Sequence, residues 1–250
     1  MIHAFGPQAA KALVRSPRVA LRCCRWEPDV FPKSEMFASV TLLFIRHGRQ
    51  QPDDNGQIGP LSPLSERGRR QADMVAAEVG LGSPIAAVYS SPLPRALATA
   101  EAICGRLLCK PYIEPRLTEF ELGTRGTSEI ADRTDLLIWR PSDTGEDGET
   151  LCSFCQRVSA FCDEIVQRHT EQRIVIVSHA GTIDAAIRWA LGIHPEAPWQ
   201  HEVEVQHASI TEVEFWPRGR IAGGSPRYAV LRRVNDTVHL KTLATDRCPD

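Results

Sequence analysis

The 250-residue sequence predicts an α/β fold, a three-layer sandwich with a mostly parallel central sheet and helices on both faces. Strand-like segments alternate along the chain with segments whose apolar residues recur at helical spacing. Residues 173–178 are nearly continuous Ile and Val, which is typical of a parallel strand buried on both faces. Residues 40–45 form another apolar run, which stops abruptly at Arg46-His47-Gly48. Because open α/β sheets bind ligands at the carboxyl ends of their strands, this tripeptide marks a candidate site.

The first half of the folded region is expected to contain two strands, two helices and a turn-rich loop. Ser65 is of a residue type preferred at a helix N-cap, and the apolar stripe that follows it ends at Gly80. The preceding loop is rich in Pro, Gly, Asp and Asn, which favour turns. In chain order, the expected elements are a strand at 40–45, a loop at 51–63, a helix at 65–80, a strand at 85–89 and a helix at 96–107.

The second half is expected to continue this alternation and to finish with a closing strand and a hairpin. Residues 150–169 have helical apolar spacing, whereas apolar and polar residues alternate after residue 200. The expected elements are a short strand at 112–114, an inserted helix and polar loop at 130–148, a helix at 150–169, a strand at 173–178 and a helix at 180–191.

We predict a single folded domain over residues 39–250 and a separate N-terminal extension at residues 1–38. The first 26 residues contain no acidic residue, and their basic residues recur at helical spacing. This pattern resembles an organelle transit peptide, although Pro17 interrupts the expected helix. An alternative is that Met36 is the true start, directly before the first strand. We expect the extension to be a peripheral or mobile arm without catalytic residues.

Composition excludes several classes of protein. A net charge of −2 disfavours a nucleic-acid-binding protein, and no apolar run approaches the roughly twenty residues that span a membrane. Five of the eight cysteines stand in helix-like apolar segments, which predicts free core cysteines in a reducing, cytoplasmic compartment. These five are Cys104, Cys109, Cys152, Cys155 and Cys162.

Four short motifs stand at or just after predicted strand ends. They are Arg46-His47-Gly48, Ser90-Ser91-x-Leu93-x-Arg95-Ala96, Leu117-x-Glu119 and Val177-Ser178-His179-Ala180-Gly181. In this order they resemble the motifs of the histidine phosphatase superfamily, also called phosphoglycerate-mutase-like, over roughly residues 40–215. The resemblance implies a phosphoglycerate-mutase-like sandwich and a catalytic domain at residues 39–250.

The residue types suit chemistry on a phosphate monoester, which carries about two negative charges. Neutral imidazole is available near pH 7 because its reference pKa is about 6.5, and guanidinium groups pair with phosphate oxygens. The resemblance implies that His47 attacks phosphorus and becomes a phosphohistidine. It also implies that Arg46 and Arg95 clamp the phosphate and that His179 stabilises the transferring group. The other His47 ring nitrogen is expected to donate to a carbonyl near Gly48, and helices starting after His47 and His179 are expected to offer backbone N–H groups.

Proton transfer is assigned to a carboxyl group at the end of the third motif. Glu119 matches the acid–base position of the family and would protonate the leaving group and later deprotonate water. That acid role requires a pKa raised from about 4.3. Glu121 is a rival, because alternate residues of an extended segment point to the same side.

Further residues are predicted to contact the substrate, and several depart from the family pattern. Arg49 and Gln50 stand where family members usually carry Glu or Gln and then Thr or Ser. The position of a pocket asparagine is left open between two residues, and the turn at Gly148-Glu149-Thr150 resembles the Gly-Glu-Ser turn of the family. The predicted substrate-binding residues are Gly48, Asp53 or Asn55, Glu149, Ala180, His207 and Trp139, which could stack on a planar ligand.

The sequence predicts a metal-independent phosphatase, a phosphoric monoester hydrolase with no cofactor, acting on a small phosphorylated molecule. A sugar phosphate, a nucleotide or flavin mononucleotide, and a biosynthetic intermediate all remain candidate substrates. Two alternatives stay open: a cofactor-dependent phosphoglycerate-type mutase and a non-catalytic phospholigand-binding protein. The span from Glu119 to Glu149 is short for a mutase of the family, which favours the phosphatase. No nucleic-acid or membrane partner is expected, and the sequence permits a homodimer.

Overall fold

The computed structural model describes residues 39–121, 148–200, 202–216 and 228–244. All of these residues belong to one unit of the chain, Phe37–Asp250. The extension predicted at 1–38 and nearly all of the insertion predicted at 130–148 lie outside the described residues. Among the described helices, none combines the length and apolar character needed to cross a lipid bilayer.

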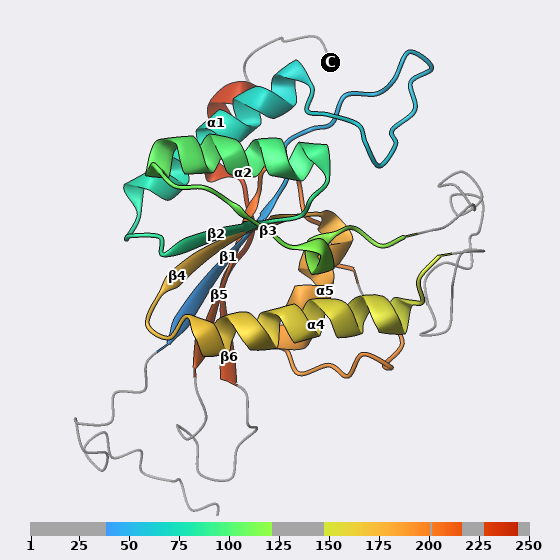
Figure 1. The fold of residues 1–250 in the computed structure, drawn as a ribbon, viewed down its shortest axis with the longest axis vertical. Helices are drawn as coiled ribbons and strands as arrows, with labels where there is room; N and C mark the ends of the chain where they lie inside the picture. Colours follow the sequence, from blue (N-terminus) through green and yellow to red (C-terminus); the bar gives the residue numbers. More distant parts are fainter. Residues whose placement is uncertain (1–38, 122–147, 201, 217–227, 245–250) are drawn as a thin grey trace, which may run out of the picture. The chain divides into compact units, whose positions relative to one another are not determined.

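A six-stranded mixed sheet with the strand order β3-β2-β4-β1-β5-β6 forms the centre of this unit (Figure 1). Four neighbouring strands run parallel, and β5 is antiparallel to β1 and to β6. The β1–β4 pair occupies the middle of the sheet, which is consistent with the two most apolar runs in the sequence. The strands are β1 (Val40–Arg46), β2 (Ala87–Ser90), β3 (Tyr112–Ile113), β4 (Arg173–Ser178), β5 (Ile210–Trp216) and β6 (Tyr228–Asp236).

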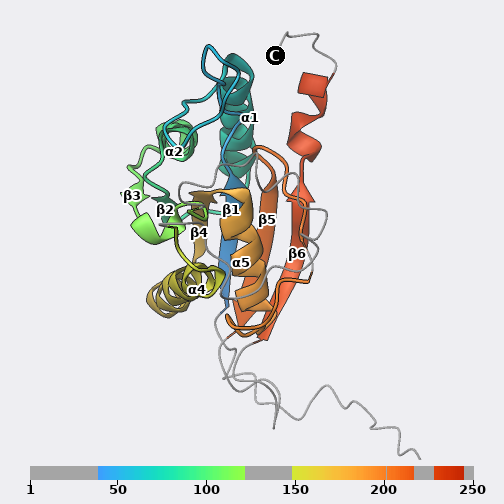
Figure 2. The same cartoon turned by 90° about the vertical axis from the view of Figure 1, so that its right-hand side faces the viewer.

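Helices cover both faces of the sheet, so the predicted three-layer α/β sandwich is confirmed (Figures 1 and 2). Alternate residues of β1 point to opposite sides: Leu43 and Ile45 pack with α1 and α2, and Leu42 and Phe44 pack with α4 and α5. The helices are α1 (Glu66–Leu81), α2 (Pro94–Leu107), α4 (Leu151–Arg168) and α5 (Ala180–Ala190), with 3₁₀ helices η1 (Pro115–Leu117) and η2 (Val238–Ala244).

The helix boundaries follow from local chemistry. Ser65 caps α1 as predicted, because its side chain accepts a hydrogen bond from Gly68 N. Thr150 does the same for α4 by accepting from Ser153 N. The expectation that all five internal cysteines are core residues is wrong for Cys109. It follows the left-handed residue that ends α2 and is exposed, whereas three of the other four are buried.

Candidate active site

Two histidines emerge side by side from the central strand pair. Arg46 and Ser178 are register partners at the ends of β1 and β4, so the chain leaves both strands at the same edge. His47 N donates to Ser178 O at 2.9 Å, and the rings of His47 and His179 lie 5.0 Å apart between centroids. The sheet therefore brings together two site residues that are 132 positions apart in the sequence.

The His47 ring is held in one tautomer. Its Nδ1 lies 2.7 Å from Gly48 O, which can only accept, so Nδ1 carries the proton as expected. The lone pair of Nε2 accepts a hydrogen bond from Arg95 Nε at 3.1 Å. Burial, together with the nearby His179, Arg95 and Arg46, holds the pKa of His47 well below its usual value. The imidazole is therefore neutral at pH 7, with its lone pair on Nε2.

Backbone packing fixes the loop that follows His47. Gly48 N donates to Thr99 Oγ1 on α2, and Arg49 N donates to Gln71 Oε1 on α1. A Cβ added to Gly68 would lie 2.0 Å from Arg49 O, so the loop touches the backbone of α1 at this point. The position of His47 thus depends on a close approach that any side chain at residue 68 would prevent.

Arg46 and Arg95 both lie close enough to the imidazole to lower the pKa of His47. The Arg46 guanidinium donates to Val205 O, and Arg95 Nη1 donates to Pro60 O at 2.7 Å. Burial lowers the pKa of both guanidinium groups, and Glu119 opposes that shift. The buried Arg95, the half-buried Arg46 and two neutral imidazoles create an environment in which a dianion is favoured.

His179 is the N-cap of α5, which begins at Ala180. Its Nε2 lies 2.8 Å from Ser91 Oγ, and among the described residues no partner faces its buried Nδ1. The helix expected after His47 is α1, which begins at Glu66 beyond the predicted loop. Helices α2 and α5 both begin at this edge, and Gly181 N of α5 donates to Glu119 Oε2.

Glu119 lies against the first turn of α5. Its Oε1 accepts from Phe120 N at 3.0 Å and its Oε2 from Gly181 N at 3.2 Å. Burial raises the pKa of this carboxyl above its usual value despite those donors and the nearby arginines. A Cβ at Gly181 would meet Glu119 Oε1 at 2.5 Å, so glycine at this position makes room for the carboxylate. The rival Glu121 is exposed to solvent.

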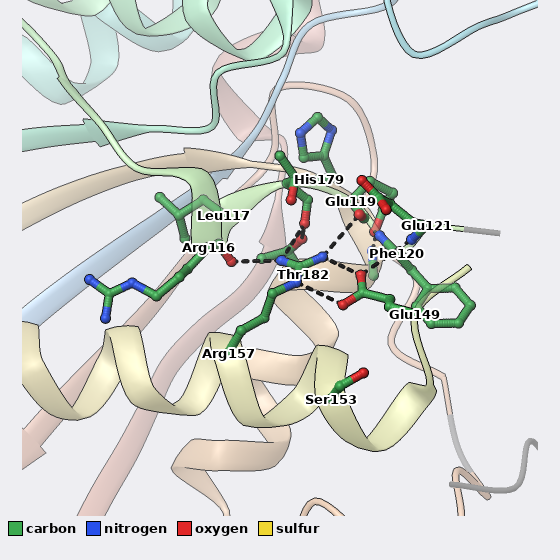
Figure 3. A network of polar contacts seen from close by, with 12 residues as sticks. Arg116, Leu117, Glu119, Phe120, Glu121, Glu149, Ser153, Arg157, His179 and Thr182 are labelled. Carbon is green, nitrogen blue, oxygen red and sulfur yellow. Dashed lines mark hydrogen bonds and ion pairs between the residues drawn. The ribbon is translucent and has the colours of Figure 1, made fainter. Parts of the chain in front are cut away.

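Arg157 of α4 holds the segment that carries Glu119 through hydrogen bonds to its backbone carbonyls (Figure 3). Its Nη1 donates to Arg116 O at 2.7 Å and to Thr118 O at 2.9 Å, and its Nη2 donates to Glu119 O at 3.0 Å. Glu149 in turn orients this guanidinium group, because it accepts from Arg157 Nε at 2.9 Å and from Arg157 Nη2 at 2.5 Å. One guanidinium group therefore fixes three backbone carbonyls of the short segment that carries the carboxyl group.

The remaining predicted residues occupy different places. Asp53 is exposed and accepts from Asn55 N and Gln57 N, which makes it the organiser of a local turn. Glu149 is engaged by Arg157, and Ala180 lines a cavity beside Glu119. His207 lies close to His47, with 5.5 Å between ring centroids, whereas Trp139 lies outside the described residues.

A cavity of ≈ 560 Å³ adjoins the acid side of the site. It is lined by Phe120, Phe154 and Trp199 together with Arg46 and Gly181. Its aromatic side chains suit the carbon skeleton of a small ligand whose charged end reaches Arg46, and polar residues that include Asp184, Glu202 and Glu204 complete the lining. Among the described residues, no three His, Cys, Asp or Glu side chains are grouped to hold a metal ion.

Sequence reasoning missed three supporting groups: Ser91, Thr99 and Arg157. Ser91 contacts His179, and Thr99 accepts from the Gly48 amide. Ser91 belongs to the second motif and Thr99 follows it within the same helix start, which was their sequence signal. Arg157 interrupts the apolar face of α4 between Phe154 and Val158, which is a signal for a buried polar contact.

Comparison with known proteins agrees with this geometry. Residues 42–223 match the model of the histidine phosphatase superfamily, branch 1. The chain is 29% identical to phosphoserine phosphatase 1 of Hydrogenobacter thermophilus, over 80% of this chain and 94% of the relative. It is 28% identical to a probable phosphoglycerate mutase GpmB of Proteus mirabilis, over 83% of this chain and 98% of the relative. A phosphoserine phosphatase from Entamoeba histolytica, solved with 3-phosphoglyceric acid, superposes with a TM-score of 0.62 at 25% identity, covering 80% of this chain and 99% of that one.

Proposed function

The chain belongs to the histidine phosphatase superfamily, branch 1, and on that premise we propose that it is a metal-independent phosphatase of small phosphate monoesters. The observation that carries the proposal is the tautomer of His47 and the neutral charge of its ring. Nδ1 is fixed on Gly48 O, so the neutral ring directs its Nε2 lone pair toward Arg95, where a phosphate would be held. Neutral imidazole approaches a dianion without repulsion, and phosphohistidine formation requires this lone pair.

In the first step, His47 Nε2 attacks phosphorus while the bond from phosphorus to the ester oxygen breaks. Arg46 and Arg95 donate to the phosphoryl oxygens, and His179 Nδ1, which is buried without a protein partner, donates to a third. Glu119, whose pKa is raised by burial, gives its proton to the departing oxygen and becomes a carboxylate. The alcohol leaves from the side of the apolar cavity.

In the second step, the Glu119 carboxylate takes a proton from water as the water oxygen attacks phosphorus. The phosphorus–Nε2 bond breaks, inorganic phosphate is released, and both His47 and Glu119 return to their starting protonation states. Arg157 keeps the carboxyl group in place through both steps by holding the carbonyls on either side of it.

The relatives supply the first substrates to examine. One is named a phosphoserine phosphatase, and a solved neighbour carries that name with 3-phosphoglyceric acid bound. We therefore place O-phosphoserine and 3-phosphoglycerate beside sugar phosphates and flavin mononucleotide in the substrate panel. A mutase is the second candidate, because a probable phosphoglycerate mutase is similar over 98% of its length. Rapid exchange of phosphoglycerate isomers in the presence of bisphosphoglycerate would favour the mutase.

The direct test is hydrolysis of an aryl phosphate in the presence of a chelator. We expect wild-type protein and the matched control His194→Ala, which changes an exposed histidine, to turn over equally. We expect His47→Ala to lose activity. Turnover that requires added metal, or that survives in His47→Ala, contradicts the proposal. Tight binding of phosphorylated ligands without any turnover would instead indicate a binding protein.

A further inference from the structure

Two free cysteines, Cys104 and Cys109, lie at the carboxyl end of α2. The helix carries Arg95 of the phosphate clamp in its first turn and spans 14 residues, so its two ends are about 20 Å apart. Both thiols therefore lie well away from the catalytic groups, and the proposed reaction gives neither of them a role. Any function of this pair is separate from phosphate transfer.

The turn that ends α2 brings the two cysteines together. Leu108 has a left-handed backbone (φ 56°), and its N–H and that of Cys109 both donate to Cys104 O, the bond from Cys109 N measuring 3.1 Å. The Cys109 bond links the first and sixth residues of the turn, which is the mark of a Schellman motif. In this motif the side chains of those two residues are frequently in contact. The two thiols do interact, because a hydrogen bond with Cys109 contributes to the raised pKa of Cys104.

The geometry of this turn suits a disulfide bond. Bridged cysteines have Cα atoms about 4.4–6.8 Å apart. Two strand residues that are joined by backbone hydrogen bonds have Cα atoms about 5.5 Å apart, which lies within this range. Because Cys104 and Cys109 are joined by a backbone hydrogen bond and their thiols already interact, a bond between the two sulfur atoms requires little movement of the backbone.

A second pair of cysteines, Cys152 and Cys155, shows the contrast. They lie three residues apart within α4. Side chains at this helical spacing have Cβ atoms about 5–6 Å apart, whereas a disulfide requires about 3.5–4.5 Å. This pair can be bridged only if the first turns of α4 unwind, which would also displace Arg157. The end of α2 is therefore the favoured place for a disulfide among the described residues.

The two thiols differ in their access to reagents. Cys109 is exposed, whereas Cys104 is only 3% exposed and packs in the core between α1 and α2. Burial raises the pKa of the Cys104 thiol to about 12, and the neighbouring Cys109 adds to this shift. A reagent from solvent therefore reaches Cys109 first, and Cys104 reacts from inside the fold.

We propose that Cys104 and Cys109 form a reversible disulfide by exchange with a small disulfide, and that this bond locks the end of α2. In the first step, the Cys109 thiolate attacks one sulfur of the small disulfide, the bond between its sulfurs breaks, and one thiol leaves. In the second step, Cys104 gives its proton to solvent and its sulfur attacks that of Cys109, which releases the second thiol. The protein loses two protons and two electrons, and the small disulfide takes up both.

The test exposes the protein to oxidised glutathione at mildly alkaline pH, blocks the remaining thiols and digests the product with trypsin without reduction. Trypsin cleaves after Arg106, between the two cysteines, so the disulfide joins peptides 96–106 and 107–116. We expect mass spectrometry to find this linked pair and a reducing agent to separate it. In Cys104→Ala the exposed thiol has lost its partner, so we expect glutathione to remain attached to peptide 107–116.

Cys109→Ser removes the same bond without a change in the core, because Cys109 is exposed. Oxidised wild-type protein should unfold about 4–8 °C higher than reduced protein, as the closing of a short loop predicts, and Cys109→Ser should lose this rise. Cys152→Ser is the matched control, since it changes another cysteine that is not fully buried, and it should keep both the linked peptides and the rise. We expect Cys109→Ser to hydrolyse the aryl phosphate within about twofold of wild type.

Two results would overturn the disulfide itself. One is the absence of the linked peptides from oxidised wild-type protein, and the other is a glutathione group that stays on Cys109 in wild-type protein as firmly as in Cys104→Ala. A disulfide that forms without raising the unfolding temperature would overturn its role in locking the end of α2. If Cys104→Ala does not fold, the linked peptides and Cys109→Ser decide the question alone.

Discussion

The two halves of the active site are held in place by different kinds of contact. The nucleophile half consists of His47 and the loop to Arg49, and it rests on backbone approach to Gly68 and on main-chain hydrogen bonds. The acid half consists of Glu119 and the segment around it, and it is held mainly by side-chain donors, of which Arg157 supplies three hydrogen bonds to backbone carbonyls. Changes in the first half should therefore cost stability, and changes in the second should cost rate.

The same physical cause prepares both halves for opposite roles. Burial disfavours charge, so it lowers the pKa of His47 and raises the pKa of Glu119. The imidazole is thereby kept as a free base, and the carboxyl group keeps its proton to a higher pH. A base and an acid can thus share one site at one pH because desolvation shifts the pKa values of cationic and anionic groups in opposite directions.

The largest effect is expected from Glu119→Gln, which removes the proton donor and keeps the shape. With an alkyl phosphate, kcat should fall by about 10²–10⁴, the usual contribution of general acid–base catalysis. With an aryl phosphate, the first step should be affected far less, because its leaving group needs little protonation. Single-turnover release of the alcohol measures this step. Glu121→Gln is the control, since that carboxyl is exposed, and an equal loss in this variant would mean that the acid is assigned wrongly.

Gly68→Ala tests the backbone contact of the nucleophile half. Its Cβ would lie 2.0 Å from Arg49 O, so the helix and the loop must separate. We expect a loss of about 1–3 kcal/mol in the free energy of unfolding, measured by denaturant titration. Gly105→Ala within α2 is the control, because no atom lies within 4 Å of its added Cβ, and it should not destabilise the protein. Unchanged stability in Gly68→Ala would remove the distinction between the two halves.

Arg157→Lys tests the acid half without removing its charge. Lysine cannot donate to Glu149 and to three carbonyls at once, so the Glu119 segment should loosen. We expect kcat for an alkyl phosphate to fall about tenfold while KM stays within about twofold, because the phosphate clamp is untouched. Arg168→Lys, which changes an exposed ion pair on the same helix, should behave as wild type. A rise in KM with kcat unchanged would argue against positioning of the acid.

The smallest effect concerns the pH profile. Activity needs His47 deprotonated and Glu119 protonated, so kcat/KM should rise as pH increases through the lowered pKa of His47. It should fall as pH increases through the raised pKa of Glu119. Glu119→Gln should lose the falling limb with an alkyl phosphate and keep the rising one. A falling limb that persists in this variant would assign that limb to another group.

Much of the fold and the central site could be predicted from the sequence, because these features depend on local patterns. Apolar runs ending in Arg46-His47 and Ser178-His179 located the central strands and the two histidines at their ends. The role of Arg157 could not be predicted, because its partners lie up to 41 residues away in the sequence. The role of Glu149 could not be predicted either. A turn motif in the sequence located this residue, but only the folded structure shows that it pairs with Arg157 of α4.

The most direct test of the central claim is to trap the covalent intermediate. Wild-type protein would be mixed with phosphate monoester, quenched in alkali, which preserves phosphohistidine, and analysed by mass spectrometry of its peptides. We expect one phosphoryl group on the peptide that contains His47, accumulating further in Glu119→Gln with an aryl phosphate because the water-activating carboxylate is lost. Rapid hydrolysis with no phosphoryl group on His47, or with one on another residue, would contradict the mechanism.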